Sequence, residues 1–204
     1  STKYIPQYCG CNPENECRET RLTKDLLTHT AGYASIVHFY NSARVPSDLF
    51  SQDKHKTQEI IETKLRFQRS RGDDQLPVYS NIDYILLGFV VEHINGMSID
   101  EYVKINIYEP LGLTHTLFNP LHNAYYTKSD FAETELNGNT RNHTINFSNV
   151  RRHVLQGEVH DEKSFYSMND SSKHAGLFLN LNDMSILTQI MLNKGTYGKD
   201  MGVD

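Results

Sequence analysis

The sequence predicts a mainly helical chain with few short strands. Apolar residues recur every three or four positions in several stretches, whereas alternating strand patterns are rare. More than sixty residues after position 116 carry no sustained periodicity and are rich in Asn, Gly, Ser and His. Because amphipathic helices must bury their apolar faces against another layer, we expect a helical lobe with long irregular connections.

The first third of the chain is expected to hold two helices. A short helix is predicted over Thr23–Leu27, and Gly32 then opens an irregular stretch over residues 33–49. Ser51 is expected to cap a polar helix that ends near Phe67.

The most periodic segment is predicted to be a helix over residues 81–95, ended by Gly96. Ser98 and Glu101 have the spacing of a capping box, which predicts a further helix running toward Ile107.

The second half of the chain offers little regular structure. Residues 114–119 and 143–150 are the two stretches with a strand pattern. Asn182 is expected to cap a last helix, which ends at Gly195.

Composition narrows the possible functions. A net charge of −5 and a pI near 6.0 provide no basic face, so we expect no nucleic-acid partner. The longest apolar run, residues 84–91, is too short for a membrane span.

Cys9, Cys11 and Cys17 lack the paired spacing and nearby histidines of zinc sites, so no metal is expected. They are either reduced or form one disulfide and leave a spare thiol.

Five segments, in order, resemble the β-lactamase-related serine hydrolases, which include class C β-lactamases and D-alanyl-D-alanine carboxypeptidases. The resemblance is strongest to penicillin-binding-protein carboxypeptidases and covers nearly the whole chain. It implies the helical portion of the α/β serine β-lactamase fold. The segments are LLTHTAGY (26–33), YSNIDYILLGFVVEHINGMSIDEYV (79–103), IYEPLGLTHTLFNP (107–120), AETELNGNTR (132–141) and the stretch 157–187.

The resemblance implies a site with three elements: a Ser-x-x-Lys turn, a Tyr-x-Asn element and a Lys/His-Thr-Gly strand. Tyr79 and Asn81 match the second element. Tyr79 is then the catalytic residue that moves the proton of the attacking serine, and Asn81 binds the substrate amide.

The other two elements are missing. The one Ser-x-x-Lys match, Ser51 to Lys54, stands in the wrong order relative to the other segments. We therefore expect residues 1–204 to be a partial domain, without the upstream nucleophile helix and the downstream strand, and inactive by itself. Ionising an ordinary tyrosine at neutral pH costs about 4 kcal/mol, which the missing lysine would offset.

Each candidate also has an ordinary structural interpretation. Tyr79 alone would be a core tyrosine beside a helix, and Asn81 alone would be a helix cap. His29 is expected to be a hydrogen-bonded structural histidine packed below the site. Residues 160–162 (His-Asp-Glu) suggest metal or acid–base chemistry, but a hydrogen-bonded turn is the better interpretation.

By resemblance, the function is serine acylation and deacylation on D-alanyl peptides, β-lactams or small esters. The partner is a small-molecule or peptidoglycan-peptide substrate, no cofactor is implied, and the location is extracytoplasmic. One alternative is a catalytically inactive module that binds peptides through the same cleft. Another is a truncated product without its own function, whose apolar helix faces remain exposed.

Overall fold

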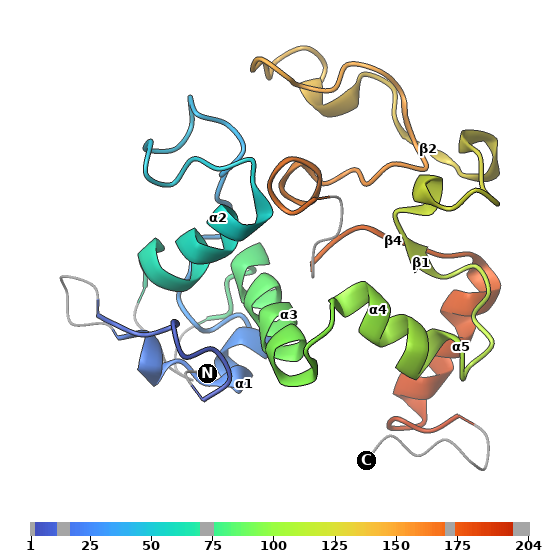
Figure 1. Ribbon diagram of the computed structural model, residues 1–204, viewed down its shortest axis with the longest axis horizontal. Coiled ribbons are helices and arrows are strands. Elements are labelled where there is room, and N and C mark those ends of the chain that lie inside the picture. The colour runs from blue at the N-terminus through green and yellow to red at the C-terminus, as the bar shows by residue number, and fades with distance from the viewer. Residues whose placement is uncertain (1–2, 12–16, 70–75, 170–173, 198–204) are drawn as a thin grey trace.

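The computed structural model describes residues 3–11, 17–69, 76–169 and 174–197 (Figure 1). The chain is mainly helical with few short strands, as the sequence predicts. The α-helices are α1 (Thr23–Leu27), α2 (Lys54–Glu59), α3 (Asn81–Asn95), α4 (Ile99–Val103) and α5 (Leu181–Leu192). Wider π-helical turns are η2 (Ile60–Lys64), η3 (Lys104–Tyr108) and η7 (Lys163–Ser167). Short 3-10 turns are η1 (Arg18–Thr20), η4 (Pro120–His122), η5 (Lys128–Asp130) and η6 (Gly138–Thr140).

The strands form two small antiparallel pairs. β1 (Leu117–Phe118) pairs with β4 (Leu177–Phe178), and β2 (Glu133–Glu135) pairs with β3 (Leu155–Gln156). The predicted strand at 114–119 is confirmed in its centre, whereas the one at 143–150 is wrong. Residues 141–143 just before and within it all have positive φ, which an extended strand does not allow.

The polar helix begins two residues later than predicted. Asp53, not Ser51, occupies the cap, and its carboxylate accepts the Lys56 N–H at 2.8 Å. Ser51 is buried, and its hydroxyl donates to the carbonyl of Asp53.

Helix α3 has the predicted bounds. Its cap is Ser80, whose hydroxyl accepts the Ile82 N–H at 3.3 Å, so the interpretation of Asn81 as the cap is wrong. Gly96 ends the helix in the left-handed region, with φ of 68°.

Two further caps differ from prediction. Ser98 precedes α4 but its side chain makes no cap bond, and Glu92 of α3 accepts the Ile99 N–H instead. The predicted capping box is therefore wrong. Asn180 rather than Asn182 caps α5, because its side chain accepts the Asp183 N–H at 2.9 Å.

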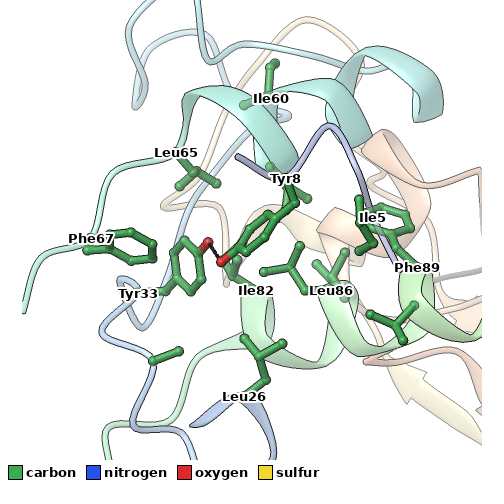
Figure 2. Packing of buried hydrophobic residues seen from close by; sticks show 14 of the residues in the cluster. Ile5, Tyr8, Leu26, Tyr33, Ile60, Leu65, Phe67, Ile82, Leu86 and Phe89 are labelled. Atoms are coloured by element: carbon green, nitrogen blue, oxygen red, sulfur yellow. Dashed lines mark hydrogen bonds between the residues drawn. The ribbon is translucent and has the colours of Figure 1, made fainter. Parts of the chain in front are cut away.

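The core surrounds α3. Apolar residues from the N-terminal segment, α1, the α2–η2 helix and α3 form one buried cluster (Figure 2). Helix α5 buries much less, because Leu181, Met184, Met191 and Leu192 stay exposed. Members of the core labelled in Figure 2 are Ile5, Tyr8, Leu26, Tyr33, Ile60, Leu65, Phe67, Ile82, Leu86 and Phe89.

Cys11 and Cys17 are joined by a disulfide, and Cys9 is free and exposed. Of the two cysteine arrangements expected, the structure has one disulfide with a spare thiol.

Among the described residues, no single helix has both the length and the apolar character of a membrane span. Within the described part of the chain, α3 and the α4–η3 helix together have the length and apolar composition of a span, but the two helices are bent by 73° relative to each other.

Candidate functional site

The backbone around Tyr79 is fixed from both sides. The N–H of Val78 donates to the carbonyl of His29 at 3.1 Å. The hydroxyl of Ser80 donates to the carbonyl of Ala34 at 2.7 Å, and Ser80 is fully buried. Since successive side chains of an extended segment point to opposite sides, Tyr79 faces outward. It is 61% exposed.

The imidazole of His29 lies directly beside Tyr79. The two ring centroids are 4.7 Å apart, and the ring of Tyr84 lies 5.2 Å away from the same imidazole. His29 Nδ1 is 2.9 Å from Oδ2 of Asp83. His29 is therefore hydrogen-bonded and packed next to Tyr79, as the sequence predicts.

Asp83 is a buried carboxyl on the first turn of α3, 1% exposed. Burial raises its pKa to about 6, although the hydrogen bond from His29 opposes that shift. Asp83 and His29 thus form a hydrogen-bonded pair, and the imidazole of that pair packs against the exposed Tyr79 ring.

Tyr79 and Asn81 line one hollow of about 410 Å³. The residues of segment 161–163, Arg141, Ser35 and His38 also line this hollow. The fold thus brings together the two predicted site residues with Asp161 and Glu162. His160 does not line this hollow.

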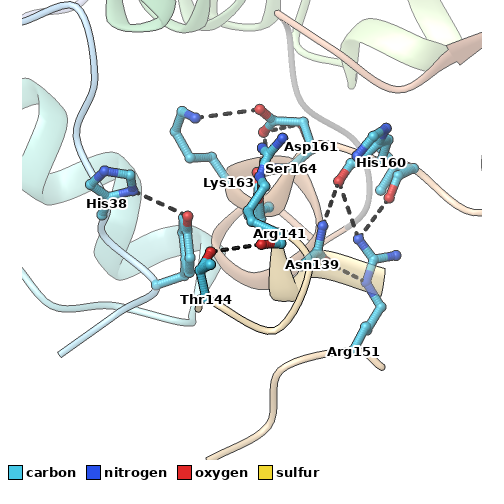
Figure 3. Close-up of polar contacts among 12 residues, drawn as sticks. His38, Asn139, Arg141, Thr144, Arg151, His160, Asp161, Lys163 and Ser164 are labelled. Carbon is cyan, nitrogen blue, oxygen red and sulfur yellow. Dashed lines mark hydrogen bonds and ion pairs between the residues drawn. The ribbon is translucent and has the colours of Figure 1, made fainter. Parts of the chain in front are cut away.

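The carboxylate of Asp161, which lines the hollow, has three neighbours. It accepts the Ser164 N–H at 2.9 Å and lies 3.3 Å from the Lys163 ammonium (Figure 3). It also lies 3.1 Å from His174 Nε2. Burial by itself would raise the pKa of Asp161, but the His174 hydrogen bond and the Lys163 charge outweigh it. The pKa lies well below its usual range.

Residues 160–162 are hydrogen-bonded as expected, but they lead into η7 instead of forming a turn, and each has a different partner. The carbonyl of His160 accepts from the Asn139 side chain at 3.0 Å. Glu162 accepts from Arg141, with Nη2 to Oε1 at 2.8 Å. Among the described residues, the side chains of residues 160–162 do not form a group whose ligand atoms converge as those of a metal site do.

A hydrogen-bonded pair, His38 and Tyr40, also lines this hollow. His38 Nδ1 is 3.1 Å from the hydroxyl of Tyr40. Burial lowers the pKa of His38, and the charges of Arg44 and Lys163 lower it further. His38 is therefore a neutral imidazole at neutral pH.

Sequence reasoning missed Lys163, Arg141 and His38 as parts of this hollow. They lie tens of residues from Tyr79 in the sequence, and no spacing rule connects them with it. The only available signal was the run Asp161 to Lys163, where an acid and a base lie two positions apart. Ser51 and Lys54 do not line the hollow.

One group of potential metal ligands occurs among the described residues: Cys11, Cys17 and Glu19, whose ligand atoms lie within 4.8 Å of one another. The two sulfurs are bonded to each other, so they are not available as thiolates.

Known proteins resemble this chain over nearly its whole length. A family model described as Beta-lactamase matches residues 2–203. A curated Escherichia coli K12 protein named "Putative D-alanyl-D-alanine carboxypeptidase" is 46% identical over 96% of this chain and 44% of its own length. A Salmonella gallinarum protein of the same name is 48% identical over 97% of this chain and 45% of its own length. The chain thus spans less than half the length of these relatives.

Solved structures show a similar fold. FmtA from Staphylococcus aureus matches with a TM-score of 0.58 and 19% identity, covering 96% of this chain and 45% of that one. A D-stereospecific amidohydrolase from Streptomyces matches with a TM-score of 0.58 and 18% identity, covering 94% and 52%. At these identities, the similarity concerns the fold alone.

Proposed function

Because the chain belongs to the Beta-lactamase family, we propose that it supplies the Tyr-x-Asn element of a serine hydrolase. Tyr79 carries the proton and Asn81 binds the substrate amide. The substrates are D-alanyl peptides, β-lactams or small esters. The single observation that supports this assignment is that both side chains line one hollow, with the Tyr79 side chain exposed.

The position of Asn81 in α3 favours the binding role. Ser80 already provides the helix cap, so the amide of Asn81 is not needed for capping. Asn81 is the first helical residue and lines the hollow beside Tyr79. A carboxamide there offers both a donor and an acceptor to a peptide bond.

The proposed chemistry is acyl transfer. Tyr79, as the phenolate, accepts the proton of an attacking serine hydroxyl while that oxygen bonds to the substrate carbonyl carbon. The phenol then returns the proton to the leaving group as the acyl bond breaks. Water, activated in the same way, releases the acyl group from the serine.

The nucleophile is not assigned among the residues that line the hollow. Ser35 is there, but the residue three positions later is His38, not lysine. We therefore assign the nucleophile to a Ser-x-x-Lys turn outside these 204 residues. The 204-residue chain alone is expected to be inactive.

An oxidising, extracytoplasmic location is part of the proposal. A disulfide such as Cys11–Cys17 is typical of proteins outside the reducing cytosol. A peptidoglycan-type substrate would be encountered in the same compartment.

Covalent labelling by a β-lactam tests the proposal. The protein expressed from its whole reading frame should gain the mass of one nitrocefin molecule on a serine, whereas the 204-residue chain should not. Absence of the adduct from the whole protein, together with saturable binding of a D-alanyl-D-alanine peptide, would instead identify an inactive binding module.

A further inference from the structure

His29 holds the Tyr79 segment through its backbone and its side chain. Its carbonyl accepts the Val78 N–H at 3.1 Å, and its Nδ1 lies 3.3 Å from the Ser80 nitrogen. His29 itself has φ of 57°, in the left-handed region that residues other than glycine rarely adopt. Such a conformation persists only where the surroundings hold it, and it occurs preferentially near functional sites.

The proton between His29 and Asp83 has two possible positions. With the proton on Nδ1, the imidazole donates to the Asp83 carboxylate across 2.9 Å, and the Ser80 N–H loses its acceptor. With the proton on Asp83, the acid donates to Nδ1, whose single lone pair then has two donors, Asp83 and Ser80. In both cases, the position of the shared proton determines how the N–H of Ser80, the residue after Tyr79, is hydrogen-bonded.

Asp83 is poorly satisfied for a buried acid. Its Oδ1 has no hydrogen-bond partner among the described residues. After His29, the positive charge of Arg69 lowers the pKa of Asp83. The negative charge of Asp83 in turn raises the pKa values of the buried Tyr8 and Tyr33 hydroxyls. Burial raises the pKa of Asp83 to about 6, within reach of ordinary buffers.

We propose that Asp83 and His29 are positioning residues for Tyr79, and that the proton they share controls how the phenol ring is held against the imidazole. The inference rests on the role of Tyr79 proposed above. It follows from a strained His29 backbone, a buried carboxyl with one unpaired oxygen, and an imidazole packed between Tyr79 and Tyr84. Neither residue touches the reacting atoms, so both act through the orientation of Tyr79.

A pH titration by NMR tests the coupling without requiring catalysis. The 204-residue chain would be labelled with ¹³C on histidine and tyrosine rings, with signals assigned from His29→Gln and Tyr79→Phe. We expect the His29 and Tyr79 ring signals to shift together, with one midpoint near pH 6. A Tyr79 signal that stays constant while the His29 signal shifts would overturn the proposal. The variants serve only to assign the signals, and the titration itself is read from the native sequence.

Asp83→Asn is the matched substitution, because it keeps the shape and removes the ionisation. It should abolish the shared step from both signals. Asp183→Asn is the control, since Asp183 is also a buried aspartate on the first turn of a helix but holds His115 and Thr116 instead. It should leave the step intact. A step near pH 6 in the Tyr79 signal that survives in Asp83→Asn would contradict the inference.

Kinetics on the protein from its whole reading frame separate this inference from the proposed function. Asp83→Asn should lower kcat by about tenfold to a hundredfold, as expected for a misplaced catalytic group, and leave KM nearly unchanged. If Tyr79→Phe has no effect on turnover, the proposed function fails while the NMR coupling can still hold. If Tyr79→Phe abolishes turnover but Asp83→Asn changes neither kcat nor its pH profile, only the positioning role fails.

Discussion

The imidazole of His29 lies against the phenol of Tyr79, with 4.7 Å between the ring centroids. This contact joins two segments fifty residues apart in the sequence and places the end of α1 next to the start of α3. The same segments are linked by the hydrogen bond from Ser80 to Ala34. The ring of Tyr79 therefore packs against a neighbouring side chain, and the backbone beside it is held by a hydrogen bond. A residue that is proposed to transfer a proton needs this kind of fixed position.

Asp83 makes the free energy of unfolding depend on pH in an unusual direction. Because burial raises its pKa to about 6, the folded state holds this proton more tightly than the unfolded state does. The resulting stability is present below about pH 4 and is lost as the pH rises through about 6, by no more than about 3 kcal/mol. Urea unfolding from pH 4 to 8 should show this slope in the native sequence and not in Asp83→Asn. Equal slopes would contradict the prediction.

Asp161 should have the opposite pH dependence. Its pKa is depressed in the folded state, so its contribution is present above about pH 4 and is lost as the pH falls below that value. Asp161→Asn should reduce the free energy of unfolding at pH 7 by about 2 kcal/mol, because the buried Lys163 ammonium loses its counter-charge. The exposed Asp48→Asn variant is the control for a general loss of negative charge. An Asp161→Asn variant as stable as the native chain would refute this account.

Two glycines with similar backbones should tolerate alanine differently. Gly138 has φ of 60°, and a Cβ there would lie 2.1 Å from the carbonyl oxygen of Arg151. Gly96 has φ of 68°, but a Cβ there would meet open space. Gly96→Ala should therefore lose about 1 kcal/mol from backbone strain alone, while Gly138→Ala should lose at least twice as much. Thermal melts of the two variants compare the values, and equal losses would exclude the predicted clash.

The Cys11–Cys17 disulfide closes a short loop, because the two cysteines are six positions apart in the sequence. Loop-closure entropy predicts that its removal costs about 2 kcal/mol. Cys11→Ser/Cys17→Ser should show that loss in chemical denaturation, whereas Cys9→Ser, at the exposed free thiol, should not. Peptide mapping under non-reducing conditions would separately reveal a Cys9 disulfide, which would contradict the assigned pairing.

The helical elements were largely predictable from the sequence because their signals are local. The apolar spacing and Gly96 predicted α3 correctly. The errors arose where a residue of another element replaced the expected local partner. At the start of α4, the Ile99 N–H donates to Glu92 of α3 and not to the Ser98 side chain. The prediction of a strand at 143–150 was wrong because residues 141–143 adopt positive φ. The alternation of residue types in the sequence does not reveal this.

The candidate site was only partly predictable. Tyr79 and Asn81 belong to one short motif, so the sequence suggested both. Asp83 stood inside the same stretch, but its importance depends on burial and on His29, which is fifty-four positions away. Lys163 and Arg141 enter the hollow through the folding of long irregular segments, which no periodic pattern describes.

The proton-transfer role that we propose for Tyr79 is tested most directly by the rate of serine acylation. In the protein from its whole reading frame, the burst of p-nitrophenol from a p-nitrophenyl ester reports acylation alone. Tyr79→Phe should slow that burst by about a hundredfold or more, the usual contribution of general acid–base catalysis. His122→Gln, which lies outside the hollow, should leave the burst unchanged. A Tyr79→Phe burst as fast as that of the native protein would contradict the assignment.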